Sequence, residues 1–127
     1  MSSILIVDDD PANREILRAR LEQAGHQVTE ASDGEKGFAL AEEMLPDLVL
    51  LDVMMPRVDG LQVCRQMKAN PKTKNIPVIM LTAMGQQIDQ LRAWESGANE
   101  YLGKPWDPKI LLEMVGKWCP APAAEKP

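Results

Sequence analysis

Residues 4–11 read Ile-Leu-Ile-Val-Asp-Asp-Asp-Pro: four apolar residues, then three aspartates and a proline. The apolar residues form the first of five short apolar runs in the chain, and a helix-like pattern follows each run. Asp10 before Pro11 is typical of a helix N-cap followed by the first helical residue. We therefore expect a strand that ends on aspartates and leads directly into a helix.

The same succession of an apolar run and a helical pattern continues along the chain. Weak alternation predicts a strand over residues 26–31, and short apolar stretches predict further strands over residues 48–51, 77–81 and 100–102. Helical spacing predicts helices over residues 11–24, 33–45, 59–69, 86–96 and 107–118. Gly25, Pro46 and Gly97 stand where three of these helices are expected to end.

This order of elements predicts an α/β fold. Strands that alternate with helix-length connections form a parallel sheet with helices on both faces. The chain has 127 residues, which fits an open, doubly wound, flavodoxin-like (βα)5 sheet in the order 2-1-3-4-5 and is too short for an eight-fold barrel. We expect one domain over residues 1–119, followed by a Pro/Ala-rich tail or truncated linker over residues 120–127.

Composition narrows the class of protein. With 45% hydrophobic residues the chain is too apolar for intrinsic disorder, and its apolar runs are too interrupted for a membrane span. The net charge of −5 argues against direct nucleic-acid binding, which needs a basic face. Cys64 and Cys119 lack metal or redox spacing, and no signal-peptide pattern begins the chain, so we predict a cytoplasmic protein. The single His26 excludes a multi-histidine metal site.

Polar residues end four of the five apolar runs or follow them. They are Asp8, Asp9, Asp52, Thr82 and Lys104. In a parallel sheet of this kind, ligands bind beyond the carboxyl ends of the strands. Clustered carboxylates repel one another unless a cation neutralises them, and oxygen ligands without His or Cys favour Mg²⁺, or Mn²⁺, over zinc. A carboxylate beside such a metal can accept a phosphoryl group, while a lysine and a threonine hold the phosphoryl oxygens.

Each of these residues has an ordinary explanation when it is taken alone. An acidic patch is usually a solvated face or a set of helix caps, and Asp10 fits a cap. Thr82 alone would be an ordinary strand-end residue, and Lys104 alone a surface lysine. Their joint occurrence at the ends of the expected strands is what favours a site.

Five motifs stand in order along the chain and together indicate a family. They are residues 4–11, 51–56 (Leu-Asp-Val-Met-Met-Pro) with Asp59-Gly60, 81–83 (Leu-Thr-Ala), 96–98 (Ser-Gly-Ala) and 104–105 (Lys-Pro). Through them the chain, from about residue 4 to 116, resembles the receiver domain of bacterial two-component response regulators, chemotaxis regulators among them.

The resemblance implies a role for each matching position. Asp52 is expected to be the phosphoacceptor, and Thr82 and Lys104 are expected to contact the phosphoryl group. Thr82 and Tyr101 are expected to act as the switch pair. The expected Mg²⁺ ligands are Asp8, Asp9, Asp52 and the backbone carbonyl of Met54.

The resemblance also implies partners. A histidine kinase or a His-containing phosphotransfer protein would donate the phosphoryl group. The face formed by the fourth helix, the fifth strand and the fifth helix would then change and control a protein effector, with the chain monomeric or dimerising on phosphorylation. The alternatives are an N-terminal receiver fragment of a larger regulator, such as a cyclase or a hybrid kinase, and an interaction module that works without phosphorylation.

Two other functional classes fit the residues less well. An Asp-nucleophile phosphohydrolase would need a second acid two residues after Asp52, where Met54 stands, and the aspartates after the first strand would repel a flavin phosphate. We therefore predict a signalling switch and not an enzyme that turns over a separate substrate. In the family, the positions of Met54 and Met84 tune the lifetime of the phosphoryl group. Neither side chain can orient a water by hydrogen bonding, so we expect slow self-dephosphorylation.

Overall fold

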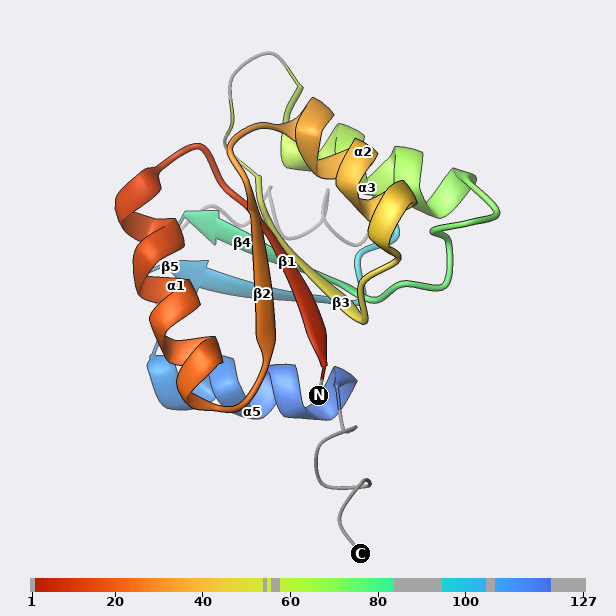
Figure 1. Ribbon diagram of the computed structural model, residues 1–127. Helices are drawn as coiled ribbons and strands as arrows, with labels where there is room; N and C mark the ends of the chain where they lie inside the picture. The colour runs from red at the N-terminus through yellow and green to blue at the C-terminus, as the bar shows by residue number, and fades with distance from the viewer. Residues whose placement is uncertain (1, 54, 56–57, 84–94, 105–106, 120–127) are drawn as a thin grey trace, which may run out of the picture.

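The computed structural model describes residues 2–53, 55, 58–83, 95–104 and 107–119. Its centre is a parallel sheet of five strands in the order β2-β1-β3-β4-β5, as the sequence predicted (Figure 1). The strands are β1 (Ser3–Val7), β2 (Gln27–Ala31), β3 (Leu48–Asp52), β4 (Val78–Ala83) and β5 (Glu100–Lys104).

Helices cover both faces of the sheet (Figure 1). Those described are α1 (Pro11–Gln23), α2 (Gly34–Met44), α3 (Gly60–Ala69) and α5 (Pro108–Trp118). The helix predicted over residues 86–96 lies almost wholly outside the described residues. Within the described ranges, every helix is too short or too polar to span a bilayer.

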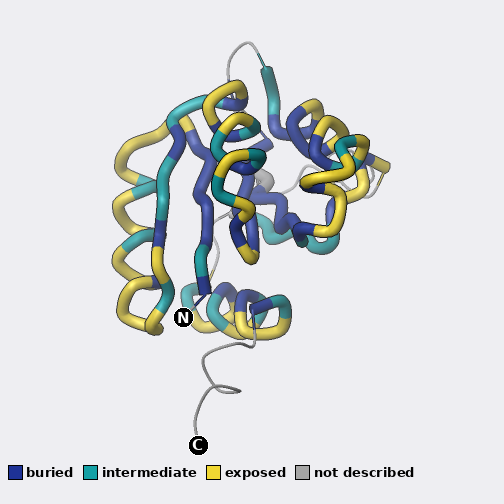
Figure 2. Tube along the Cα trace, turned by 45° about the vertical axis from the view of Figure 1, so that its right-hand side comes forward, coloured by how far each residue is buried: buried dark blue, intermediate teal, exposed yellow. Residues whose placement is uncertain are grey.

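The sheet separates two apolar layers. On β1, Leu5 and Val7 face the layer under α2 and α3, whereas Ile4 and Ile6 face the layer under α1 and α5. Every one of these side chains is buried, and the exposed positions lie mainly on the helices and their connections (Figure 2). Burial on both faces explains why β1 and β3 are nearly continuous apolar runs, whereas β2, at the side of the sheet, carries the exposed or half-buried Gln27, Thr29 and Glu30.

Aspartates begin all four described helices. The N-caps are Asp10, Asp33, Asp59 and Asp107, and each side chain accepts a backbone N–H of the first helical turn. Such caps satisfy donors that have no partner within the helix. The predicted cap role of Asp10 is therefore confirmed. The capping aspartates have a local structural task, which sets them apart from Asp8, Asp9 and Asp52.

Two strands extend two residues further at their carboxyl ends than the sequence predicted. β4 continues to Ala83 instead of residue 81, and β5 continues to Lys104 instead of residue 102. The two extensions pair with each other, because Thr82 lies opposite Gly103 and Ala83 opposite Lys104. A backbone ladder needs no apolar side chains, so the apolar runs predicted strands that were too short.

Candidate functional site

Three carboxylates meet at the carboxyl ends of β1 and β3. Val7 of β1 and Leu51 of β3 are paired in the sheet. Asp8 and Asp52 each follow one of these residues and therefore lie side by side. One carboxylate oxygen each from Asp8, Asp9 and Asp52 lies within 4.8 Å of the others. Asp8 is 0% exposed and Asp52 is 4% exposed, whereas Asp9 is open to solvent. The predicted grouping of these three residues is thus present in the structure.

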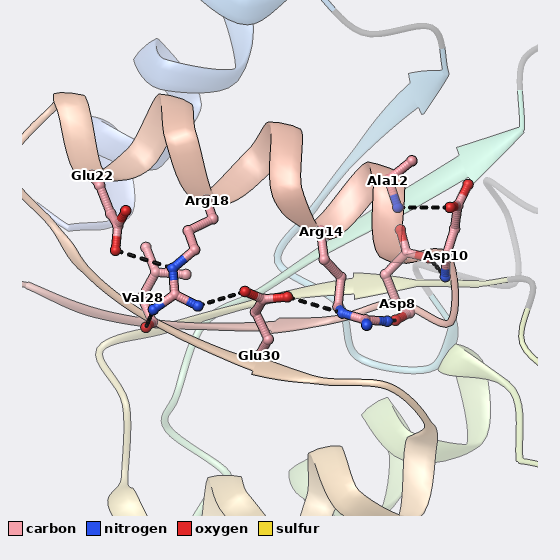
Figure 3. Close-up of polar contacts among 8 residues, drawn as sticks. All are labelled: Asp8, Asp10, Ala12, Arg14, Arg18, Glu22, Val28 and Glu30. Carbon is pink, nitrogen blue, oxygen red and sulfur yellow. Dashed lines mark hydrogen bonds and ion pairs between the residues drawn. The ribbon is translucent and has the colours of Figure 1, made fainter.

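The connection between β1 and α1 holds Asp8 through a series of hydrogen bonds. Its backbone N–H donates to the carbonyl of Ala31 on β2 at 3.1 Å. Its Oδ1 accepts the backbone N–H of Asp10 at 2.9 Å, and Asp10 Oδ1 accepts that of Ala12 at 2.9 Å (Figure 3). The cap of α1 therefore also orients a carboxylate of the cluster.

Arg14 completes this connection, and the sequence did not indicate it. Its backbone N–H donates to the carbonyl of Asp10 at 3.1 Å. Its Nη1 reaches back to the carbonyl of Asp8 at 2.7 Å, and its Nε donates to Glu30 Oε1 at 2.9 Å. A signal existed in the sequence, because an arginine at the fourth helical position lies one turn above the cap. Its target on β2, however, is 16 residues away in the chain.

Gly60 allows α3 to approach the backbone of Asp52. Its N–H donates to the carbonyl of Val53 at 3.1 Å. A Cβ at this position would lie 2.1 Å from the carbonyl oxygen of Asp52, which is closer than any nonbonded contact allows. Asp59, just before it, forms a capping box with Gln62 and fixes the start of the helix. The glycine lets the helix begin directly against the strand end that carries Asp52.

The other predicted site residues are placed by their backbones. Asp52 pairs with Leu81, so Thr82 is one step beyond the residue opposite Asp52. Lys104 pairs with Ala83 at the neighbouring strand end. The side chains of Thr82 and Lys104 and the whole of Met54 lie outside the described residues. Tyr101 is half-buried on β5 and packs against the apolar layer under α2 and α3.

The donor set suits a hard divalent cation. All three described ligand candidates are carboxylates, and Mg²⁺ prefers oxygen donors. Two of the carboxylates are buried, where repulsion between like charges is screened less than in water. A cation beside them lowers that repulsion. Asp8, Asp9 and Asp52 therefore fit Mg²⁺.

Comparison with known proteins defines the class. The family model of the response regulator receiver domain matches residues 4–116 of the chain. The chain belongs to this family. Receiver domains are signalling switches of two-component systems, and they interact with histidine kinases or phosphotransfer proteins and with effectors.

Curated relatives place the chain within that class. It is 48% identical to the DNA-binding dual master transcriptional regulator RpaA of Synechocystis over 91% of this chain and 48% of that protein. It is 45% identical to the response regulator PleD of Caulobacter vibrioides over 88% of this chain and 25% of that protein. The chain thus spans half or less of these two relatives. It is also 44% identical to protein PilH of Pseudomonas aeruginosa, over 91% of this chain and 95% of PilH.

Solved structures agree on the fold. The receiver domain of sensor histidine kinase PA1611 from Pseudomonas aeruginosa superposes with a TM-score of 0.87 at 32% identity, covering 94% of this chain and 98% of that one. That structure has a magnesium ion coordinated in its active-site cleft. The chemotaxis protein CheY4 of Vibrio cholerae superposes with a TM-score of 0.86 at 29% identity, covering 92% of this chain and 98% of that one.

Proposed function

We propose that Asp52 accepts a phosphoryl group from a histidine kinase or a His-containing phosphotransfer protein. The observation that carries this proposal is the convergence of Asp8, Asp9 and Asp52 within 4.8 Å at two neighbouring strand ends. One carboxylate oxygen of Asp52 attacks the phosphorus, and the bond from phosphorus to the donor's imidazole nitrogen breaks. The electron pair stays on that nitrogen, and the product on this chain is an acyl phosphate.

Four positions would hold the metal. They are Asp8, Asp9, Asp52 and the backbone carbonyl of Met54. When bound, Mg²⁺ supplies positive charge that screens the carboxylates from the incoming phosphoryl anion. Mn²⁺ prefers the same oxygen ligands and would suit the same positions. Hydrogen bonds in the β1–α1 connection hold Asp8 in position, and buried Asp52 lies at the end of β3. The two buried carboxylates are thus preorganised, which removes an ordering cost from the reaction.

Three further residues would respond to the new phosphoryl group: Thr82, Lys104 and Tyr101. Thr82 and Lys104 stand near the carboxyl ends of β4 and β5; β4 lies beside β3, which ends in Asp52, and β5 lies beside β4. Thr82 and Lys104 would contact the phosphoryl oxygens, and Tyr101 would move with Thr82. The face formed by the predicted fourth helix, β5 and α5 would then bind a protein effector, as a monomer or a phosphorylation-dependent dimer.

The domain is assigned to residues 1–119, with residues 120–127 as a tail or linker. The alternative is a receiver that forms part of a larger regulator, and it is favoured by the 48% and 25% shares of RpaA and PleD that the chain covers. The match over 95% of PilH favours the other reading, in which the receiver acts on an effector that is a different protein. The cytoplasmic location remains a prediction.

The deciding experiment is intact mass after incubation with acetyl phosphate and Mg²⁺. The wild-type chain should gain about 80 Da as one phosphoryl group. Asp52→Ala and wild type in EDTA should gain nothing. Asp47→Ala is the matched control, because Asp47 is an exposed aspartate at the amino end of β3, opposite to the end that carries Asp52. This variant should gain the same mass as wild type. If neither acetyl phosphate nor a promiscuous histidine kinase modifies wild type, the proposal is wrong.

A further inference from the structure

Two arginines on α1 bind one glutamate on β2 from neighbouring turns of the helix. Arg14 Nε and Arg18 Nη1 donate to the two oxygens of Glu30 (Figure 3). Each arginine also donates to a backbone carbonyl: Arg14 to Asp8 at 2.7 Å, and Arg18 to Val28 at 3.2 Å. Arg18 Nε also donates to Glu22 Oε2 at 3.1 Å. Both side chains thus bind Glu30 and a backbone carbonyl, but of the two only Arg14 touches a residue of the carboxylate cluster.

The contact from Arg14 closes a ring of hydrogen bonds around Asp8. The Asp8 carboxylate accepts from the Asp10 backbone, the Asp10 carbonyl accepts from the Arg14 backbone, and the Arg14 side chain donates to the Asp8 carbonyl. The Asp8 N–H is already held by Ala31 on β2. Both main-chain polar groups of Asp8 and one carboxylate oxygen are therefore fixed at the point where the chain leaves the sheet.

We propose that Arg14 is a positioning residue for the metal-binding carboxylates, which it sets by anchoring the Asp8 carbonyl to Glu30 on β2. The inference rests on the proposed function, because it assumes that Asp8 and Asp9 bind Mg²⁺. A planar guanidinium can donate in two fixed directions at once, to Glu30 and to the carbonyl, whereas a lysine ammonium is a point charge on a flexible stem. The peptide bond that Arg14 holds leads directly from Asp8 to Asp9.

Arg14 is more buried than Arg18, so its hydrogen bonds are expected to contribute more. The Arg14 side chain is 17% exposed and that of Arg18 is 42% exposed. Hydrogen bonds from Arg18 and then from Arg14 lower the pKa of Glu30 below its ordinary value, so the glutamate stays ionised as their anchor. Exposed ion pairs contribute little, and a less exposed, charge-assisted bond contributes more.

The sign of the effect separates positioning from bulk electrostatics. A cation near a metal site repels Mg²⁺, so removing the charge of Arg14 should tighten Mg²⁺ binding if charge were all that mattered. Loss of positioning should weaken it, because partners that orient metal ligands typically contribute about 10–100-fold in affinity. We expect Arg14→Ala to weaken Mg²⁺ binding about tenfold.

The experiment titrates MgCl₂ into the whole chain and follows the backbone amide of Asp10 by NMR. Arg18→Ala is the matched control, since it also loses Glu30 and a backbone carbonyl, and its Mg²⁺ affinity should stay within about twofold of wild type. Arg14→Lys should recover little of the loss, because one ammonium cannot replace the two directed donors. If Arg14→Ala does not fold, Glu30→Gln loosens the same anchor and should weaken Mg²⁺ binding by a smaller factor.

The outcomes are distinct. Weaker binding in Arg14→Ala with an unaffected Arg18→Ala supports positioning. Equal affinities in the two variants, or tighter binding in Arg14→Ala, overturn it. If wild type itself does not bind Mg²⁺, the proposed function has failed, and the positioning role fails with it. If wild type binds Mg²⁺ and is phosphorylated while Arg14→Ala behaves like wild type, only the positioning role is wrong.

Discussion

The two ends of the parallel strands use polar residues in opposite ways, and we call them the carboxyl edge and the amino edge of the sheet. At the carboxyl edge, Asp8, Asp9 and Asp52 bring like charges within 4.8 Å. At the amino edge, polar side chains meet complementary groups: Asp47 Oδ2 accepts the Ser3 N–H at 2.8 Å, tying the start of β1 to the residue before β3. Like charges in one place need a ligand to offset their repulsion, whereas complementary groups complete the fold by themselves.

Lys68 on α3 is a second example of complementary polar contacts at the amino edge, near the starts of β4 and β5. Its Nζ donates to the carbonyl of Ile76 at 2.7 Å and to Asn99 Oδ1 at 3.0 Å, and Asn99 Oδ1 also accepts the Val78 N–H at 2.9 Å. Burial lowers the pKa of Lys68. We therefore expect substitutions at the amino edge to change stability and substitutions at the carboxyl edge to change ligand binding.

The largest expected effect is at Gly60, where the carboxyl edge depends on close backbone packing. Gly60→Ala places a Cβ 2.1 Å from the Asp52 carbonyl oxygen, so α3 or β3 must shift. We expect a loss of about 3–4 kcal/mol in the free energy of unfolding, measured in urea. Gly116→Ala is the control, because no atom lies within 4 Å of its Cβ and alanine suits a helix. A small loss in Gly60→Ala would contradict the packing argument.

A matched pair of aspartates tests the comparison directly. Asp9→Asn should weaken Mg²⁺ binding by about 100-fold, since it removes an expected ligand, and should leave stability in EDTA unchanged or higher. Asp47→Asn should leave Mg²⁺ binding unchanged and lower the free energy of unfolding by about 1 kcal/mol, because a charge-assisted bond to Ser3 becomes a neutral one. Calorimetric Mg²⁺ titration and urea unfolding measure both quantities. The reverse pattern would refute the division between the edges.

Lys68→Met tests the amino edge. The substitution removes a donor from Ile76 O and Asn99 Oδ1, and we expect a loss of about 2 kcal/mol in the free energy of unfolding. Phosphorylation by acetyl phosphate should keep its wild-type rate in the folded protein. Lys72→Met, at an exposed position on the connection from α3 to β4, is the control and should change stability by less than about 0.5 kcal/mol. Slower phosphorylation in Lys68→Met would show that the two edges are coupled.

Met54→Asn sharpens the comparison at the carboxyl edge. Met54 lies outside the described residues, and this prediction comes from the sequence. An amide could orient a water for attack on the acyl phosphate, which the thioether cannot do. We expect dephosphorylation about tenfold faster, measured by phosphate release after removal of the donor. A wild-type phosphoryl group that is lost within seconds would contradict the prediction of slow self-dephosphorylation.

The smallest expected effect is the pH dependence of an ion pair at the start of β5. A hydrogen bond from Lys117 at 2.7 Å, with a weaker one from Trp118, lowers the pKa of Glu100 below its ordinary 4.5. A depressed carboxyl pKa stabilises the fold above pH 4.5, and that stability is lost as pH falls through the folded value. Glu100→Gln should therefore reduce the loss of unfolding free energy between pH 7 and about pH 3. An unchanged pH profile would show that the exposed Lys117 contributes nothing.

Much of the fold and the core of the site followed from the sequence. Runs of apolar residues identify strands buried on both faces, and a parallel sheet places their carboxyl ends at one edge. Those two rules are enough to predict that Asp8 and Asp52 lie at the same edge of the sheet. Asp10 before Pro11 indicated where α1 begins, because capping is a local interaction.

Only the tertiary structure revealed the contacts that support the site. The bond from Arg14 to the Asp8 carbonyl, the approach of Gly60 to Asp52 and the bond from Lys68 to Asn99 each depend on how separate elements pack. A hydrophobic pattern reports whether a position is buried. It does not report which distant group a long polar side chain reaches, because that depends on the distance between elements to within a few tenths of an ångström.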